Sequence, residues 1–309
     1  MVIVDPGAPD VTFETVRAAL AQQDVVLEIV VVANDRADGE AKGSPAHPAA
    51  HLPGVRVVRS GRSTNDVGSG VAATAGGVIA LLDHRARLDL GALAALVAPL
   101  DDPSVGAVTA RIVLQGTDPV LVGSTGAEVT RSANRRDRDW GLPFVDLDRP
   151  AMPAMAFSAT AAALRREAVA DAGGWSVDGS FASYEDIELS FRLRRRGWSI
   201  VHAPEAGVRC RQLGPTGADS PPFLRLVERA RLRFAITHGT PGVIARTLWR
   251  TFAGAWLLLL RRDVTGFRQR LGSLGAITRQ LPELSRRRRA LSRSATASLR
   301  ELWAEAPAD

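Results

Sequence analysis

Three short groups of polar residues in this 309-residue chain carry side chains that can do chemistry. Carboxylates accept protons and coordinate hard cations, and an arginine guanidinium pairs with phosphate oxygens. Each group follows an apolar run or begins a helical pattern, which places it at the end of an element. The groups are Asn34-Asp35, Asp83-His84-Arg85 and Glu185-Asp186.

Apolar runs alternate with helix-like segments along residues 1–115. The runs predict buried strands because they are short and rich in Val, Ile and Leu, and the segments between them have helical spacing. This alternation predicts an α/β fold with a mainly parallel sheet, whose ligands bind beyond the carboxyl ends of the strands. The predicted strands are residues 2–4, 25–32, 54–59, 78–82 and 105–114, and the predicted helices are residues 11–22, 67–75 and 90–100.

The next hundred residues divide into an irregular part and a regular part. Residues 116–155 are polar and rich in Arg and Asp, and a loop of this length either serves a binding site or is a surface insertion. Residues 159–172 predict a helix that ends at Gly173-Gly174. Glu185 and Asp186 begin the following helix, where the helix dipole favours carboxylates, and residues 199–202 predict a strand.

The order of these signals over about residues 1–211 resembles the inverting family 2 glycosyltransferases, which have the GT-A fold, a Rossmann-like mainly parallel sheet flanked by helices. The strongest matches are three motifs in the family order. They are Gly173-Gly174-Trp175, the run from Tyr184-Glu185-Asp186 to Gly197-Trp198, and Ala203-Pro204-Glu205-Ala206.

The resemblance implies roles for the polar groups in binding a nucleotide-sugar donor and an acceptor. Asp186, beside Glu185, corresponds to the general base that deprotonates the acceptor hydroxyl, and Trp175 borders the acceptor. The donor-side residues are Asn34, Asp35, Asp83 and Arg85, with Asp83 as a ligand for Mg²⁺ or Mn²⁺. An alternative interpretation is that Glu185 and Asp186 only cap a solvated helix start.

Departures from the family pattern fall on the donor side. Ala33 stands where an acidic residue commonly contacts the base, Arg85 replaces the second metal carboxylate, and Cys210 falls near the place of a histidine. Under one hypothesis Arg85 neutralises the donor diphosphate and no cation is needed. Under the other, the donor site is degenerate and the protein is a non-catalytic binding or scaffold protein.

The C-terminal part differs from the rest in charge. Residues 224–309 contain 17 Arg and 6 Asp plus Glu, a net charge of +11, so residues 1–223 carry −5 of the total of +6. Three features of this part fit binding to an anionic membrane surface. They are its helix-like pattern, the apolar residues 252–260 with Trp249 and Trp256, and the Arg-rich residues 286–289. The nine apolar residues are too few to span a bilayer, which needs ~20. A helical hairpin with a solvated basic face is the alternative, and genome composition alone explains the arginine count but not its clustering.

We therefore expect a GT-A-like domain over residues 1–213 and an Arg-rich, membrane-associating helical tail over residues 214–309. The expected reaction is inverting transfer of a hexosyl or deoxyhexosyl group to a glycan or lipid-linked acceptor, as in cell-wall polysaccharide synthesis. We expect a cytoplasmic location, peripheral on the membrane, because no secretory signal is visible and Cys210 is the single cysteine. Nucleic-acid binding is not expected, since no recognised module is present.

Overall fold

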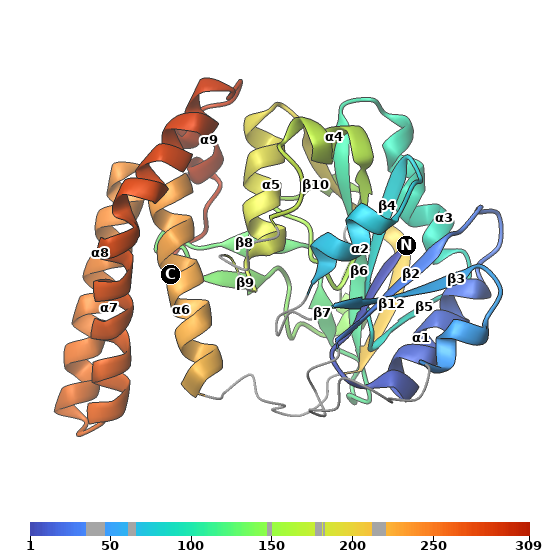
Figure 1. Ribbon diagram of the computed structural model, residues 1–309, viewed down its shortest axis with the longest axis horizontal. Helices are drawn as coiled ribbons and strands as arrows, with labels where there is room; N and C mark the ends of the chain where they lie inside the picture. Colours follow the sequence, from blue (N-terminus) through green and yellow to red (C-terminus); the bar gives the residue numbers. More distant parts are fainter. Residues whose placement is uncertain (35–46, 61–65, 147–149, 177–180, 182, 212–220) are drawn as a thin grey trace. The chain divides into compact units, whose positions relative to one another are not determined.

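The computed structural model describes residues 1–34, 47–60, 66–146, 150–176, 181, 183–211 and 221–309 (Figure 1). The chain divides into two compact units. The first comprises Met1–Ala127, Asp137–Val177 and Trp198–Gln212, and the second comprises Glu128–Arg136, Asp178–Gly197 and Leu213–Asp309. The predicted boundary at residue 213 lies outside the described residues and stays a prediction.

A mainly parallel sheet forms the centre of the first unit, as predicted. Its strand order is β10-β12-β6-β11-β4-β1-β2-β3, with β5 beside β12 and β7 beside β6. Parallel pairs join β1 to β2 and β4, β2 to β3, and β6 to β12, whereas β11 runs antiparallel between β4 and β6. The strands named here are β1 (Val2–Asp5), β2 (Ile29–Asn34), β3 (Val55–Ser60), β4 (Val78–Asp83), β5 (Ala86–Leu88), β6 (Val105–Gln115), β7 (Val122–Ser124), β10 (Met152–Pro153), β11 (Ala161–Arg165) and β12 (Ser199–Arg211).

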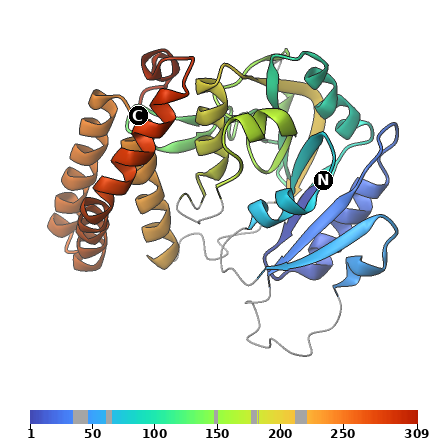
Figure 2. The same ribbon diagram turned by 45° about the horizontal axis from the view of Figure 1, so that its top comes forward.

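Helices cover both faces of this sheet. Neighbouring residues of a strand point to opposite faces, so each strand contributes side chains to both. α1 (Pro9–Leu20) and α3 (Ala92–Val97) pack on the face that includes Ile3 and Val31. α2 (Val67–Ala73) packs on the other face, as Figure 2 shows, where a Cβ at Gly70 would stand 2.3 Å from Val2. The small residues of α2 therefore allow its close approach to the sheet.

The predicted helix over residues 159–172 is wrong in its first half. Ala161–Arg165 forms the strand β11, and only Arg166–Asp171 is helical, as α4. The helix propensity of alanine is overridden because Ala161, Ala162 and Ala163 are fully buried between two strands, where small side chains fit.

Residues 116–155 are also more regular than predicted. The described part contains β7, β8 (Ala127–Val129), β9 (Arg135–Asp137), the short 3₁₀ turn η3 (Phe144–Asp146) and β10. These strands have two or three residues each, too few for alternation to be recognised in the sequence. β12 is longer than residues 199–202 because pairing with β6 resumes after a register shift between Ala203 and Gly207.

The second unit is helical, as predicted for the C-terminal part. Phe191, Phe234 and Trp303 form an aromatic cluster, and Leu232, Ile236, Ile277 and Leu284 form a further apolar cluster. The helices are α5 (Glu185–Arg195), α6 (Pro221–His238), α7 (Pro241–Leu260), α8 (Val264–Arg293) and α9 (Leu299–Ala304).

The apolar residues 252–260 belong to a longer helix than the sequence indicated. α7 starts at Pro241, with the Thr240 side chain accepting from the Val243 N–H, and it contains 20 residues. α7 is long and apolar enough by length and composition to cross a bilayer. The apolar run of residues 252–260 is too short by itself, but the helix that contains it is not.

Candidate functional site

Asp83 and Arg85 form a fixed ion pair at the carboxyl end of β4. The Nε and Nη2 atoms of Arg85 donate to the two carboxylate oxygens of Asp83 at 2.8 and 2.9 Å. The backbone N–H of Arg85 donates to the same carboxylate at 2.8 Å. This two-pronged contact orients the guanidinium and leaves its remaining N–H groups for another acceptor.

The environment keeps Asp83 ionised and His84 neutral. Burial opposes ionisation of Asp83, but the hydrogen bond and the charge of Arg85 outweigh it and hold the pKa below its ordinary value. Burial lowers the pKa of His84 despite the neighbouring Asp83. Arg85 is therefore the cation of this triplet at neutral pH.

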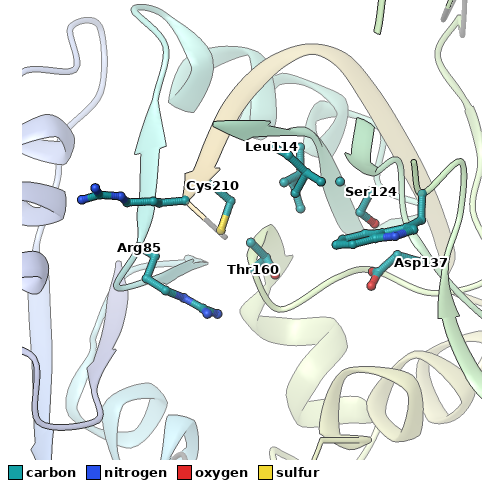
Figure 3. A pocket seen from close by; sticks show the side chains of 10 residues that line it. Arg85, Leu114, Ser124, Asp137, Thr160 and Cys210 are labelled. Carbon is teal, nitrogen blue, oxygen red and sulfur yellow. The ribbon is translucent and has the colours of Figure 1, made fainter. Parts of the chain in front are cut away.

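Arg85 lines a cavity of about 150 Å³ within the first unit. Figure 3 shows Arg85 and Cys210 on one side of this cavity and Ser124 and Asp137 on the other. Trp140, whose side chain is half exposed, adds an aromatic surface. Burial raises the pKa of the Cys210 thiol to about 11, so this side chain is a neutral wall of the cavity. A cation, a carboxylate, hydroxyls and an indole suit a ligand that is both anionic and rich in hydroxyl groups.

Other polar residues lie at the same carboxyl edge of the sheet. Asn34 ends β2, and Asp35 lies outside the described residues. Asp5 ends β1, the strand beside β4, and its carboxylate accepts from the N–H groups of Gly7 and Ala8. It also lies 3.0 Å from Nε2 of His47.

Three features of this edge were missed in the sequence. Asp5 lies just beyond the predicted strand of residues 2–4, although it ends β1 as Asp83 ends β4. Asp137 and Trp140 belong to residues 116–155, whose place around the Arg85 cavity depends on long-range contacts. The Arg and Asp content of that segment was the available signal.

Asp186 lies in the first turn of α5 and is buried, with 6% of its side chain exposed. One carboxylate oxygen accepts from Nη2 of Arg135 at 3.0 Å, and the other accepts from the Ile187 N–H. The hydroxyl of Tyr184 accepts from the Arg135 N–H at 3.1 Å and donates to the Ala133 carbonyl at 3.0 Å. The segment around Arg135 is thus bonded to the start of α5, and Asp186 is an ion-paired group rather than a solvated one.

Glu185 and Trp175 have different surroundings. Burial, with a contribution from the negative charge of Asp186, raises the pKa of Glu185 to about 8, so it is protonated at neutral pH. Trp175 is buried in the first unit against Phe157, with ring centres 6.4 Å apart. Its role beside the acceptor stays a prediction. Glu185 and Asp186 belong to the second unit, whereas Asp83 and Arg85 belong to the first.

The described residues around Asp83 do not form a site for a divalent cation. Both of its oxygens accept from Arg85, and a cation would need further oxygen ligands. Among the residues that the structure describes, no group of three or more His, Cys, Asp or Glu could hold a metal ion.

Comparisons with known proteins agree with this fold. The family model for "Glycosyltransferase like family 2" matches residues 1–237, and no curated protein matches. Three similar solved structures are 14 to 16% identical to this chain, a level that indicates the fold alone.

One is GalNAc-T7 with UDP, GalNAc and Mn²⁺, at a TM-score of 0.56 and 16% identity over 81% of this chain. This chain spans 53% of that chain, about half its length. Another is the mannosyltransferase PcManGT from Pyrobaculum calidifontis with GDP-Man and Mn²⁺, at a TM-score of 0.53 and 16% identity over 98% of this chain and 82% of that one. A third is S. aureus TarS with UDP-GlcNAc, at a TM-score of 0.55 and 14% identity over 98% of this chain and 87% of that one.

Proposed function

Because this chain belongs to glycosyltransferase-like family 2, we propose that it transfers a hexosyl or deoxyhexosyl group from a nucleotide-diphosphate sugar to a hydroxyl of a glycan or lipid-linked acceptor, with inversion. The observation that carries this proposal is the fixed Asp83–Arg85 pair at the end of β4, on the wall of a cavity with polar and aromatic sides. The nucleotide sugars in two of the similar structures, GDP-Man and UDP-GlcNAc, support the donor class.

Arg85 takes the place of a cation at the donor diphosphate in this proposal. A guanidinium has five N–H donors, and Asp83 uses two, so three remain for phosphate oxygens. When the bond between the sugar and the diphosphate breaks, the leaving diphosphate keeps the electron pair, and the positive charge of Arg85 stabilises it. Asp83 holds the guanidinium in orientation throughout.

The attacking hydroxyl must lose its proton as its oxygen bonds to the anomeric carbon. Asp186 is the proposed acceptor of that proton, and Arg135 compensates its charge. Glu185, beside it, is protonated at neutral pH and adds no negative charge there. One displacement from the face opposite the leaving group inverts the configuration.

A lipid-linked acceptor accords with the basic helical part of the chain. The net charge of +11 over residues 224–309 favours an anionic surface, as membrane leaflets present on their cytoplasmic side. We accordingly propose a peripheral location on the cytoplasmic membrane face.

Donor binding tests the proposal directly. Thermal shift and calorimetry would use UDP-, GDP- and dTDP-sugars with Mg²⁺, Mn²⁺ or chelator. We expect one donor class to stabilise the protein with or without cation. Arg85→Ala should weaken its binding by about 10- to 100-fold, the effect of losing a charge-assisted hydrogen bond. Arg209→Ala, which removes an exposed arginine paired with Asp89, is the matched control. If no donor binds under any condition, the non-catalytic binding or scaffold function replaces this one.

A further inference from the structure

α7 has one packed face and one exposed aromatic face. Val243, Thr247, Thr251 and Ala255 are buried at intervals of four residues. On another side of the helix, Trp249, Phe252 and Trp256 are 66, 42 and 47% exposed, and we call these three the aromatic face of α7. The ring centres of successive residues lie 6.3 and 6.1 Å apart, and the ring centre of Trp256 lies 5.5 Å from that of Phe267 in α8. Large side chains arranged in a row and left exposed indicate an interaction surface.

The surroundings of the aromatic face are basic. Residues 241–275 contain six arginines and one acidic residue, Asp263, whose carboxylate caps α8 by accepting from the Gly266 N–H. Arg261 and Arg262 stand at the end of α7, next to exposed Leu260, and the described part of the chain contains no ion pair with either. The Nη1 atoms of Arg246 and Arg250 lie 3.9 and 3.5 Å from Oδ2 of Asp309. The surface thus combines indole and phenyl rings with uncompensated positive charge.

The Arg-rich residues 286–289, by contrast, are partly used inside the second unit. Arg287 donates to Glu188 at 3.0 Å and its guanidinium lies over the Phe181 ring. Arg288 donates to the carbonyls of Ile236 and Gly239 at the end of α6. Two of the four arginines therefore stabilise the fold, which shifts the expected lipid contact from this run to α7.

We propose that the aromatic face of α7 docks parallel to the surface of an anionic phospholipid bilayer, with its rings at the boundary between headgroups and acyl chains. Arg261 and Arg262 then contact lipid phosphates. This deepens the membrane partner named under Proposed function and rests on it for the source of the acceptor, but docking itself needs no donor.

Two other arrangements fit the residues less well. If α7 crossed the bilayer, Arg246 and Arg250 would enter the hydrocarbon region, where charged side chains are costly. Buried Thr251 would also lose its hydrogen bonds with Arg231 and Glu228 of α6. If two copies paired through this face, their arginines would meet like charges.

Vesicle co-sedimentation of the full chain tests the docking. Vesicles would contain phosphatidylcholine alone or with about 30 mol % phosphatidylglycerol. We expect the wild type to bind the anionic vesicles at least about tenfold more tightly, and the triple variant Trp249→Ser, Phe252→Ser, Trp256→Ser to lose about tenfold or more. The control Arg286→Ser, Arg289→Ser changes two exposed arginines of α8 and should bind within about twofold of wild type.

Several results would overturn the proposal. One is that the triple variant binds the vesicles as tightly as the wild type while its thermal melt is unchanged. Another is equal loss in the control variant. Protein that stays with the vesicles after alkaline carbonate would indicate a spanning helix, and a dimer that the triple variant abolishes, without vesicle binding, would indicate self-association. Donor binding, measured separately in solution, distinguishes failure of docking from failure of the proposed transferase function.

Discussion

Two adjacent carboxyl groups, Glu185 and Asp186, have different surroundings. Asp186 faces the guanidinium of Arg135 at 3.0 Å, whereas burial and the charge of Asp186 raise the pKa of Glu185 to about 8. A carboxyl group whose pKa is strongly raised by burial and a neighbouring carboxyl group is typical of functional sites. In the proposed reaction Asp186 accepts the proton, and Glu185 is neutral beside it.

Asp186→Asn should lower transfer by about 10²- to 10⁴-fold without changing donor affinity, because the amide cannot accept the proton. Glu185→Gln is the matched control, since the amide resembles the protonated form present at pH 7, and its rate there should lie within about twofold of wild type. As the pH rises through about 8, Glu185 of the wild type ionises beside Asp186 whereas the amide of the control variant stays neutral, so the two rates should diverge. Release of nucleotide diphosphate, with a membrane extract as acceptor source, measures both. Undiminished transfer by Asp186→Asn would remove the base assignment.

The sequence singled out Asp83, Arg85 and Asp186 but not Arg135, the partner of Asp186. Asp83, Arg85 and Asp186 carry family motifs or follow apolar runs, which are local signals. Arg135 is 51 residues before Asp186, and the Tyr184 hydroxyl holds the backbone at Arg135 beside the start of α5. Such pairing depends on the tertiary fold, which spacing along the chain does not encode.

At the scale of elements, a buried ionic cluster joins α5 to α6 and α8. Glu188 of α5 is fully buried and accepts from Arg192 at 2.9 Å and from Arg287 at 3.0 Å, and it lies 3.3 Å from Nε2 of His238. A buried carboxylate of this kind is stable only while its cationic and hydrogen-bonding partners remain. The arginines of α8 therefore have a structural role in addition to their effect on net charge.

Glu188→Gln should lower the free energy of unfolding by about 3–5 kcal/mol, because Arg192 and Arg287 would lose their buried counter-charge. Glu283→Gln changes an exposed carboxyl of α8 and should stay within about 0.5 kcal/mol of wild type. Chemical denaturation of both variants at neutral pH makes the comparison. Equal stability of the two variants would contradict a stabilising role for the cluster.

Acid should lower the free energy of unfolding through the same cluster. Burial opposes ionisation of Glu188, but its cationic partners hold the folded pKa below the ordinary value. Its stabilisation is thus complete above the unfolded pKa of about 4.3 and is lost as the pH falls further. Burial also lowers the pKa of His238, so protonation in the unfolded state below about pH 6.5 adds to the loss. Glu188→Gln should weaken the dependence below about pH 4.3, leaving the part from His238.

The elements themselves were predictable where a periodic signal was long. β1, β3, β4, β6, α1 and α2 lie close to their predicted places, because each has an apolar run or a helical pattern. β11 was misassigned since Ala161–Arg165 has a helix-forming composition, and burial between β4 and β6 decided its structure. β7 to β10 have two or three residues each and carry no period to recognise.

At the scale of the whole molecule, charge is divided unevenly along the chain. Residues 1–223 carry −5 and residues 224–309 carry +11. A basic segment of this kind attracts anionic surfaces over about a Debye length, whereas aromatic side chains act only on contact. The two contributions to docking can therefore be separated by salt.

Raising NaCl from about 0.05 to 0.5 M should weaken wild-type binding to anionic vesicles by about tenfold, because the screening length falls below about 5 Å. Residual binding at high salt should depend on the aromatic face of α7 and disappear in Trp249→Ser, Phe252→Ser, Trp256→Ser. Arg261→Ser, Arg262→Ser should have the reverse effect, with weaker binding at low salt and little further loss at high salt. Co-sedimentation across a salt series measures all three proteins. Salt-independent binding by the wild type would contradict any contribution from the charge asymmetry, and strong high-salt binding by the triple variant would place the apolar contact elsewhere in the chain.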